Sequence, residues 1–458
     1  MAATLQFVNE VTVESPRESA ALRTMAKFYF VTMLAIIFTG AVRKWLFPGV
    51  TVLYLLQDVP MALAYLYAIW TGLFTRGYIL LGIILLSVFT TLQTLVQIIV
   101  LGLSPFVAVV GLHNYLFYLP ILVVFPLCLT EKVRKKFVWM NLILSVPMCV
   151  VAILQAQSPK SAWINRTSEG EAFGLPGVSV ARVSGTFNFT VFYGVWVAFA
   201  VALCMGEWLL PKDRRAVRNQ WLLILCTFSV NICHLVSGSR SAIALAGAAV
   251  LGGVVAAIVM GSARATMAIV GICLLLPVAA AATYFISPDE FNTVQDRFTS
   301  ERGVSSSKDR LSDSLVGFLT IPQFSLIGAG VGMGVDAAHA GNAETYNFTY
   351  SLSEDDLIRT VMELGTPVGL PYALIRIFFV TAMIILSVRL VRSGSSPHVL
   401  PLSFFLFAQT YIGDLTRAAT MTASQVMVGY AFILGAYYHP DDTAELEVAA
   451  GESLTRSV

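Results

Sequence analysis

The chain has 458 residues, of which 57% are hydrophobic and only 12% charged, and its mean hydropathy is +0.76. Ordinary soluble domains carry roughly a quarter charged residues, so this composition excludes them and favours an all-α polytopic membrane protein. The net charge of +2 is too small to indicate a nucleic-acid partner.

Apolar runs near the ~20 residues that cross a bilayer recur along the whole chain. The twelve predicted spans are 27–42, 50–70, 78–101, 106–129, 137–156, 188–210, 220–236, 241–260, 265–286, 357–388, 399–416 and 421–438. The run that starts at Leu357 is too long for one simple crossing, so its first turns are expected at the membrane interface. The polar beginning of the chain contains no signal-peptide pattern, so the first span is expected to act as the targeting anchor.

These spans divide the chain into five predicted segments. They are a cytoplasmic N-terminal segment (1–26), a nine-span bundle (27–286), a large extracytoplasmic loop (287–356), a three-span bundle (357–438) and an acidic cytoplasmic tail (439–458). The loop is a polar island in an apolar chain and carries three arginines and one lysine. A large polar loop of this kind indicates binding or chemistry at the membrane surface.

Basic residues predict the orientation of the bundle. Short loops at 132–136 and 212–218 hold clusters of lysine and arginine, and such loops are retained on the cytoplasmic side. With twelve spans, both termini are then cytoplasmic and the loop 287–356 faces outward.

The sequence lacks the common metal and nucleotide motifs. No HExxH, Walker loop or zinc spacing is present, and the six cysteines are scattered through predicted spans without a CxxC pair. The glycine repeat from Gly328 to Gly334 has no βαβ context, which favours a tight turn over a dinucleotide site. We therefore predict neither a metal nor a cofactor.

Four short stretches occur in an order that resembles the bacterial O-antigen ligase and polysaccharide polymerase superfamily, and the exopolysaccharide polymerases in particular. They are Arg182-Val-Ser-Gly-Thr-Phe-Asn188, Ser237-Gly-Ser-Arg240-Ser-Ala, Arg310 with Pro322 and the glycines at 328–332, and Glu354 to Gly369 with Met362-Glu-Leu-Gly365. Arg43-Lys44-Trp45, Asp58 and Gly111-Leu-His-Asn-Tyr115 add to the likeness. Where the ligases have histidine this chain has Glu354, followed by Asp355, which fits a polymerase better than a lipid A-core ligase.

The resemblance implies a GT-C-like glycosyltransferase of the bacterial inner membrane. Such an enzyme takes an undecaprenyl-diphosphate-linked glycan as donor and a glycan hydroxyl as acceptor, with inversion and without a nucleotide sugar or metal. A flippase and a chain-length regulator would be its partners in polysaccharide assembly. The product would be exopolysaccharide or O-antigen at the outer face of the membrane.

This chemistry needs fixed cations for the leaving diphosphate and a base for the acceptor hydroxyl. The candidate diphosphate ligands are Arg240, Arg310 and Arg182, because the guanidinium fork matches phosphate oxygens. The candidate bases are Glu354 and Asp355, with His339 as a substitute.

Each candidate also has a structural interpretation. Arg240 fits an arginine that extends to the membrane surface, and Arg310 fits a solvated loop charge. Ser353 is expected to cap the next helix, with Asp356 in a capping-box position. Asp355 with Arg359, and Arg359 with Glu363, fall at i,i+4 spacing and fit structural pairs along a helix.

Asp58 and His113 lie in predicted spans. Asp58 fits a structural ion pair, with Arg43 and Lys44 at the end of the first span, and His113 fits an interhelical hydrogen bond.

Two other functions stay open. The first is an O-antigen ligase. The second is a transporter or flippase of lipid-linked glycans, which should show repeated halves and helices broken near the bilayer midplane.

Overall fold

A computed structural model describes residues 16–74, 77–168, 182–263, 277–285, 326–334, 355–413 and 420–440, together with the single residues 266, 288 and 415. Among these residues the regular structure is helical, without a strand. The helices in the first part of the chain are α1 (Pro16–Ala41), η1 (Val42–Leu46), η2 (Thr51–Gln57), α2 (Asp58–Thr71), α3 (Tyr78–Leu101), α4 (Pro105–Leu116), α5 (Ile121–Val124), η3 (Pro126–Cys128), α6 (Glu131–Gln157) and η4 (Trp163–Asn165). They are followed by α7 (Thr190–Leu209), α8 (Gln220–Val236), α9 (Arg240–Met260), α15 (Asp356–Leu364), α16 (Thr366–Arg392), α17 (Val399–Ile412) and α18 (Thr420–Tyr438).

Eight helical segments of the described chain are long and apolar enough to cross a bilayer, which makes the fold compatible with a polytopic membrane protein. They are 18–46, 52–71, 78–101, 105–128, 131–157, 190–209, 240–260 and 366–392. Two shorter apolar helices, at 220–236 and 399–411, accompany them. Of the predicted span 265–286, only residue 266 and residues 277–285 lie in the described part.

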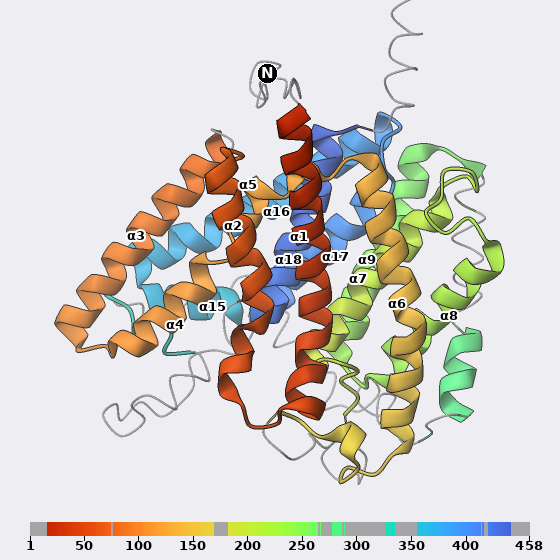
Figure 1. The fold of residues 1–458 in the computed structure, drawn as a ribbon, viewed down its shortest axis with the longest axis horizontal. Helices are drawn as coiled ribbons and strands as arrows, with labels where there is room; N and C mark the ends of the chain where they lie inside the picture. Colours follow the sequence, from red (N-terminus) through yellow and green to blue (C-terminus); the bar gives the residue numbers. More distant parts are fainter. Residues whose placement is uncertain are drawn as a thin grey trace, which may run out of the picture.

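The helix α7 lies at the centre of the bundle. Nearly all of its residues are buried, and it packs against α9, α17, α8 and α6. A helix that is apolar all round is expected either in a protein core or in a membrane. At the opposite extreme, α3 leans away from the bundle in Figure 1, and only 11% of its most apolar stretch is buried. The apolar side chains on its outer surface are those expected to meet lipid.

Two predicted spans are interrupted. The apolar run 357–388 is two helices, α15 and α16, which are separated at Gly365 with a φ of 74°. A side chain at this glycine would meet the carbonyl oxygen of Leu326 at 2.5 Å, so the break is built around glycine. The run 106–129 is likewise divided into α4, α5 and η3. The run from Leu357, which is too long for one simple crossing, is thus a short helix, a turn and then a long helix, and the single predicted span 357–388 did not include this turn.

Candidate functional site

A buried cluster of acids and arginines lies on α15 and α16, the helices that follow the predicted outer loop. The helix α15 begins with Asp355 as its N-cap, whose Oδ1 accepts the N–H groups of Leu357 at 3.0 Å and Ile358 at 3.1 Å. An aspartate at this position satisfies N–H groups that have no partner within the helix. The cap is therefore Asp355, and the expected cap at Ser353 with a capping-box Asp356 is wrong.

Asp356 is shared between two arginines. Its Oδ1 lies 2.5 Å from Nη2 of Arg359, and its Oδ2 lies 2.7 Å from Nη1 of Arg376 on α16. Both Asp356 and Arg359 are buried, at 3% and 1% exposure, so this is an ion-pair network of the protein interior and not a surface pair. The Asp356 carboxylate thus bridges two guanidinium groups, and the buried Glu363 on the same helix is a further acid that interacts with Arg359.

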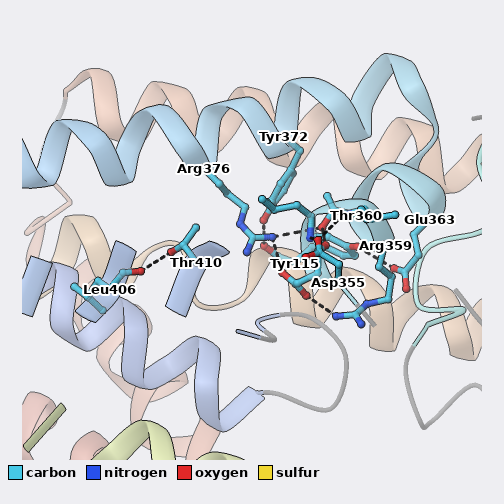
Figure 2. A network of polar contacts seen from close by, with 12 residues as sticks. Tyr115, Asp355, Arg359, Thr360, Glu363, Tyr372, Arg376, Leu406 and Thr410 are labelled. Atoms are coloured by element: carbon cyan, nitrogen blue, oxygen red, sulfur yellow. Dashed lines mark hydrogen bonds and ion pairs between the residues drawn. The ribbon is translucent and has the colours of Figure 1, made fainter. Parts of the chain in front are cut away.

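Thr360 connects the two helices at the same place. Its hydroxyl donates to the Asp356 carbonyl at 2.7 Å and accepts from Arg376 Nη1 at 3.4 Å. Figure 2 shows Arg376, Thr360, Arg359 and Tyr115 converging from α16, α15 and α4. The second guanidinium nitrogen of Arg376, Nη2, is buried and has no hydrogen-bond partner among the described residues.

Glu363, the acid of the Met-Glu-Leu-Gly motif, is fully buried one turn further along α15. It accepts the Tyr115 hydroxyl at 3.0 Å and the N–H groups of Gly332 at 3.1 Å and Gly334 at 2.7 Å. Burial raises the pKa of Glu363, while the Arg359 guanidinium and these three donors oppose the rise. Because both of its oxygens accept hydrogen bonds, this acid holds the glycine turn against α15.

The glycine turn, residues 326–334, is docked into the bundle. Gln97 of α3 donates to the carbonyls of Ile327 at 2.6 Å and Glu363 at 2.7 Å, and it accepts the Val331 N–H at 2.8 Å. Gly332 has a φ of 85°, and a side chain there would meet the Val107 carbonyl oxygen at 2.5 Å. The predicted tight turn is confirmed, and its glycines allow the backbone to approach α4 and α15 closely.

A cavity of about 220 Å³ adjoins the cluster. Its walls come from α3, α4 and the following turn, α5, α16, α17 and α18, and Arg376 forms part of the wall. Four of the lining residues are tyrosines whose hydroxyl groups are bonded to protein atoms. Tyr115 donates to Glu363, Tyr118 to Asp58 and Tyr372 to the Tyr115 carbonyl, while Tyr430 pairs with Thr410. The tyrosines therefore present mainly their rings to the cavity, which is apolar apart from a few groups that include Arg376.

The structure places the predicted site residues on different elements. Asp355 lies directly beside the buried cluster, as the N-cap of α15. Arg240 is the first residue of α9, whose N-cap Ser239 accepts the Ala242 N–H. Arg182 is half-buried before α7. Glu354, Arg310 and His339 lie outside the described residues.

The segment that follows Arg182 is fixed by two side chains from other helices. Lys44 is buried and donates to Ser184 Oγ at 3.0 Å and to the Gly185 carbonyl at 2.7 Å. Gln155 of α6 accepts the Gly185 N–H at 2.8 Å and donates to the same carbonyl at 3.1 Å. Lys44 thus holds this segment in place instead of balancing Asp58.

Asp58 contacts one residue of α4 and one residue of the turn that follows it. Its Oδ1 accepts the Tyr118 hydroxyl at 2.8 Å, and its Oδ2 lies 3.2 Å from Nε2 of His113. The structure therefore places the His113 ring beside the Asp58 carboxylate, whereas the expected partners were Arg43 and Lys44. Asp58 is buried while the His113 side chain is 22% exposed, so the pair lies at the edge of the bundle.

Sequence reasoning missed the central role of Asp356 and Arg376. The position of Arg376 could have indicated the cluster, because an arginine within an apolar span is rare unless it is paired inside the bundle. The polar Gln97 in the predicted third span was a similar signal.

Comparison with protein-family models and with curated proteins finds no significant match to this chain.

Proposed function

We propose that the protein is an integral-membrane glycosyltransferase that polymerises undecaprenyl-diphosphate-linked oligosaccharides. The reaction takes place at the outer face of the bacterial inner membrane, in a twelve-span, GT-C-like bundle with both termini in the cytoplasm. The acceptor hydroxyl displaces the lipid diphosphate from the anomeric carbon, with inversion. The O-antigen ligase reaction, which differs in its acceptor, is the alternative within the same class.

One observation supports this proposal most directly. The Asp356 carboxylate is shared by Arg359 and Arg376 in the interior, directly after the predicted outer loop and against a docked glycine turn. Guanidinium donors fixed in the interior, such as the Arg376 Nη2, are suited to an anionic leaving group, because fixed donors stabilise a developing charge more strongly in a site of low dielectric constant.

In this proposal Arg240, Arg310 and Arg182 bind the diphosphate, and Glu354 or Asp355 accepts the proton of the hydroxyl. Asp355 is close to the cluster because it caps the same helix. The cap uses Oδ1, so the carboxylate is held in a fixed orientation by backbone N–H groups. A fixed orientation favours proton transfer to a bound hydroxyl.

The helix breaks favour a second candidate, a transporter of lipid-linked glycans. Discontinuous helices are typical of transporters, and both α15–α16 and α4–α5 are interrupted.

The lipid-linked glycans of a deletion strain distinguish these functions. Single repeat units exposed on the outer leaflet are expected if a polymerase is lost. Finished lipid-linked polymer would indicate a ligase, and units retained on the inner leaflet would indicate a transporter.

A further inference from the structure

We propose that the cavity beside Arg376 binds the single hydrocarbon chain of a polyprenyl phosphate, with the phosphate end towards Arg376. The inference rests on the proposed function, since this lipid would be the carrier of the donor glycan. It adds a binding site, and a binding residue, that the sequence motifs do not contain.

The walls indicate a hydrocarbon ligand. The cavity of about 220 Å³ is lined by apolar side chains and by the rings of four tyrosines whose hydroxyl groups bond to the protein. A polar ligand would find few partners there, whereas an apolar chain loses nothing by leaving water or lipid.

The position of the cavity indicates entry from the bilayer. It reaches the surface at α3, where Gly82 lines it and is exposed. The neighbouring residues of α3, Leu81, Ile84 and Leu85, are exposed and apolar, as in a helix that faces lipid. A ligand that enters here comes from the membrane and not from water.

Arg376 indicates an anionic end group. Its Nη1 is bound to Asp356 and Thr360, but its buried Nη2 has no partner among the described residues. A buried donor without a partner is costly, and a phosphate oxygen would satisfy it with a charge-assisted hydrogen bond. A cavity of about 220 Å³ suits a lipid with one chain better than a phospholipid with two.

Gly82 offers a test that does not depend on disturbing the ion pairs. A Cβ atom at Gly82 would meet no atom within 4 Å, so Gly82→Phe places a ring at the cavity opening without displacing the fold. Gly247 of α9 is also exposed, and its Cβ would also meet open space, but it does not line the cavity. Gly247→Phe is therefore the matched control.

The measurement is photo-crosslinking of the full-length protein in nanodiscs with a diazirine-labelled farnesyl phosphate, followed by peptide mapping. Labelled peptides are expected from α4, α16 and α18. Gly82→Phe should reduce labelling by about tenfold or more, and Gly247→Phe should leave it unchanged. Equal labelling of Gly82→Phe and the wild type, or labels confined to other surfaces, would overturn the site.

Competitors identify the ligand class. Farnesyl phosphate should compete at least tenfold better than farnesol. Arg376→Gln should abolish this preference, whereas Arg376→Lys, which keeps the charge, should retain it. Equal competition by phosphatidylglycerol or by inorganic phosphate would refute the proposed occupant. Specific labelling in a protein whose deletion leaves polymerisation intact would support the lipid site and refute the polymerase function.

Discussion

Asp356 carries opposite charge to two guanidinium groups, from Arg359 on its own helix and Arg376 on the next. Removing the carboxylate leaves two buried cations facing each other, whereas removing a capping residue leaves only two N–H groups. The two neighbouring aspartates therefore have different physical roles, although they look alike in the sequence.

Asp356→Asn should be strongly destabilising, by about 3–5 kcal/mol, because it breaks a buried ion-pair network from one side. The thermal unfolding midpoint of the detergent-purified protein measures this effect. Asp213→Asn, at an exposed aspartate, is the control and should change little. A similar midpoint for both variants would show that the ion pairs around Asp356 contribute nothing to stability. The capping-box position that the sequence predicted for Asp356 would instead give only a mild effect.

Asp355→Asn should separate capping from chemistry. Asparagine caps helices about as well as aspartate, so protein level and unfolding midpoint should stay near normal. If Asp355 is the base, polymer formation should fall ~100-fold or more, the scale of general base catalysis. The readout is polymer made by membranes with lipid-linked repeat units. Glu354→Gln is tested alongside it. Normal polymer from both variants would exclude these two acids as the base and make His339 the next candidate.

Arg240→Lys tests the diphosphate role at the start of α9. Lysine keeps the charge but lacks the planar fork, so polymer formation should drop ~10²–10³-fold if the residue binds the leaving group. The exposed Arg218 provides the comparison, because Arg218→Lys should retain full activity. Activity of Arg240→Lys equal to that of the wild type would remove Arg240 from the mechanism.

At the scale of elements, the break between α15 and α16 positions the cluster. It turns the short α15 so that Asp356 faces Arg376, and it brings Glu363 to the glycine turn at 326–334. The packing of the glycine turn depends on the absence of side chains at its closest approaches.

Gly365→Ala should therefore loosen this arrangement. The added methyl group meets the Leu326 carbonyl oxygen at 2.5 Å, and alanine disfavours the φ of 74°. We expect a loss of about 1–3 kcal/mol, read as a lower unfolding midpoint. Gly247→Ala is the opposite case: it lies within α9 in open space and should be neutral or stabilising by up to ~1 kcal/mol. The same midpoint shift in both variants would argue against a strained contact at Gly365.

The sequence predicts individual helices better than their interruptions. Long apolar runs such as 78–101 and 241–260 appear as α3 and α9 with nearly the same bounds, because span length follows bilayer thickness. The division of 357–388 escaped notice, because hydropathy does not register a backbone turn at one glycine.

The site was only partly predictable for a related reason. Local spacing suggested that Arg359 pairs at i,i+4 along its own helix. In the structure it pairs at i,i+3 with Asp356, which also binds Arg376 from α16. Partners that lie on different helices depend on packing angles, which periodicity does not contain. The same holds for Gln97, whose hydrogen bonds reach the turn at Ile327 and Val331.

At the scale of the whole molecule, the orientation of the bundle in the membrane is predicted from the basic residues of its short loops. A cysteine introduced at Ser306 should react with a membrane-impermeant maleimide in intact cells, and one at Ala216 should react only after lysis. The native cysteines in the described part of the chain are buried, which keeps their background low. Labelling of position 216 with protection of position 306 would show the opposite orientation of the bundle in the membrane and would contradict a reaction at the outer face.

The central burial of α7 has a consequence for how the protein is made. Two of the helices that cover it, α17 and α18, begin roughly 190 and 210 residues after α7 ends. At about 5–20 residues per second, α7 waits for some 10–40 s during synthesis before these neighbours exist. Until then one of its faces is covered only by lipid or by an insertion chaperone. A nascent chain cut short before α17 would therefore be recognisably unfinished, and membrane proteases could remove it before any partial bundle accumulates.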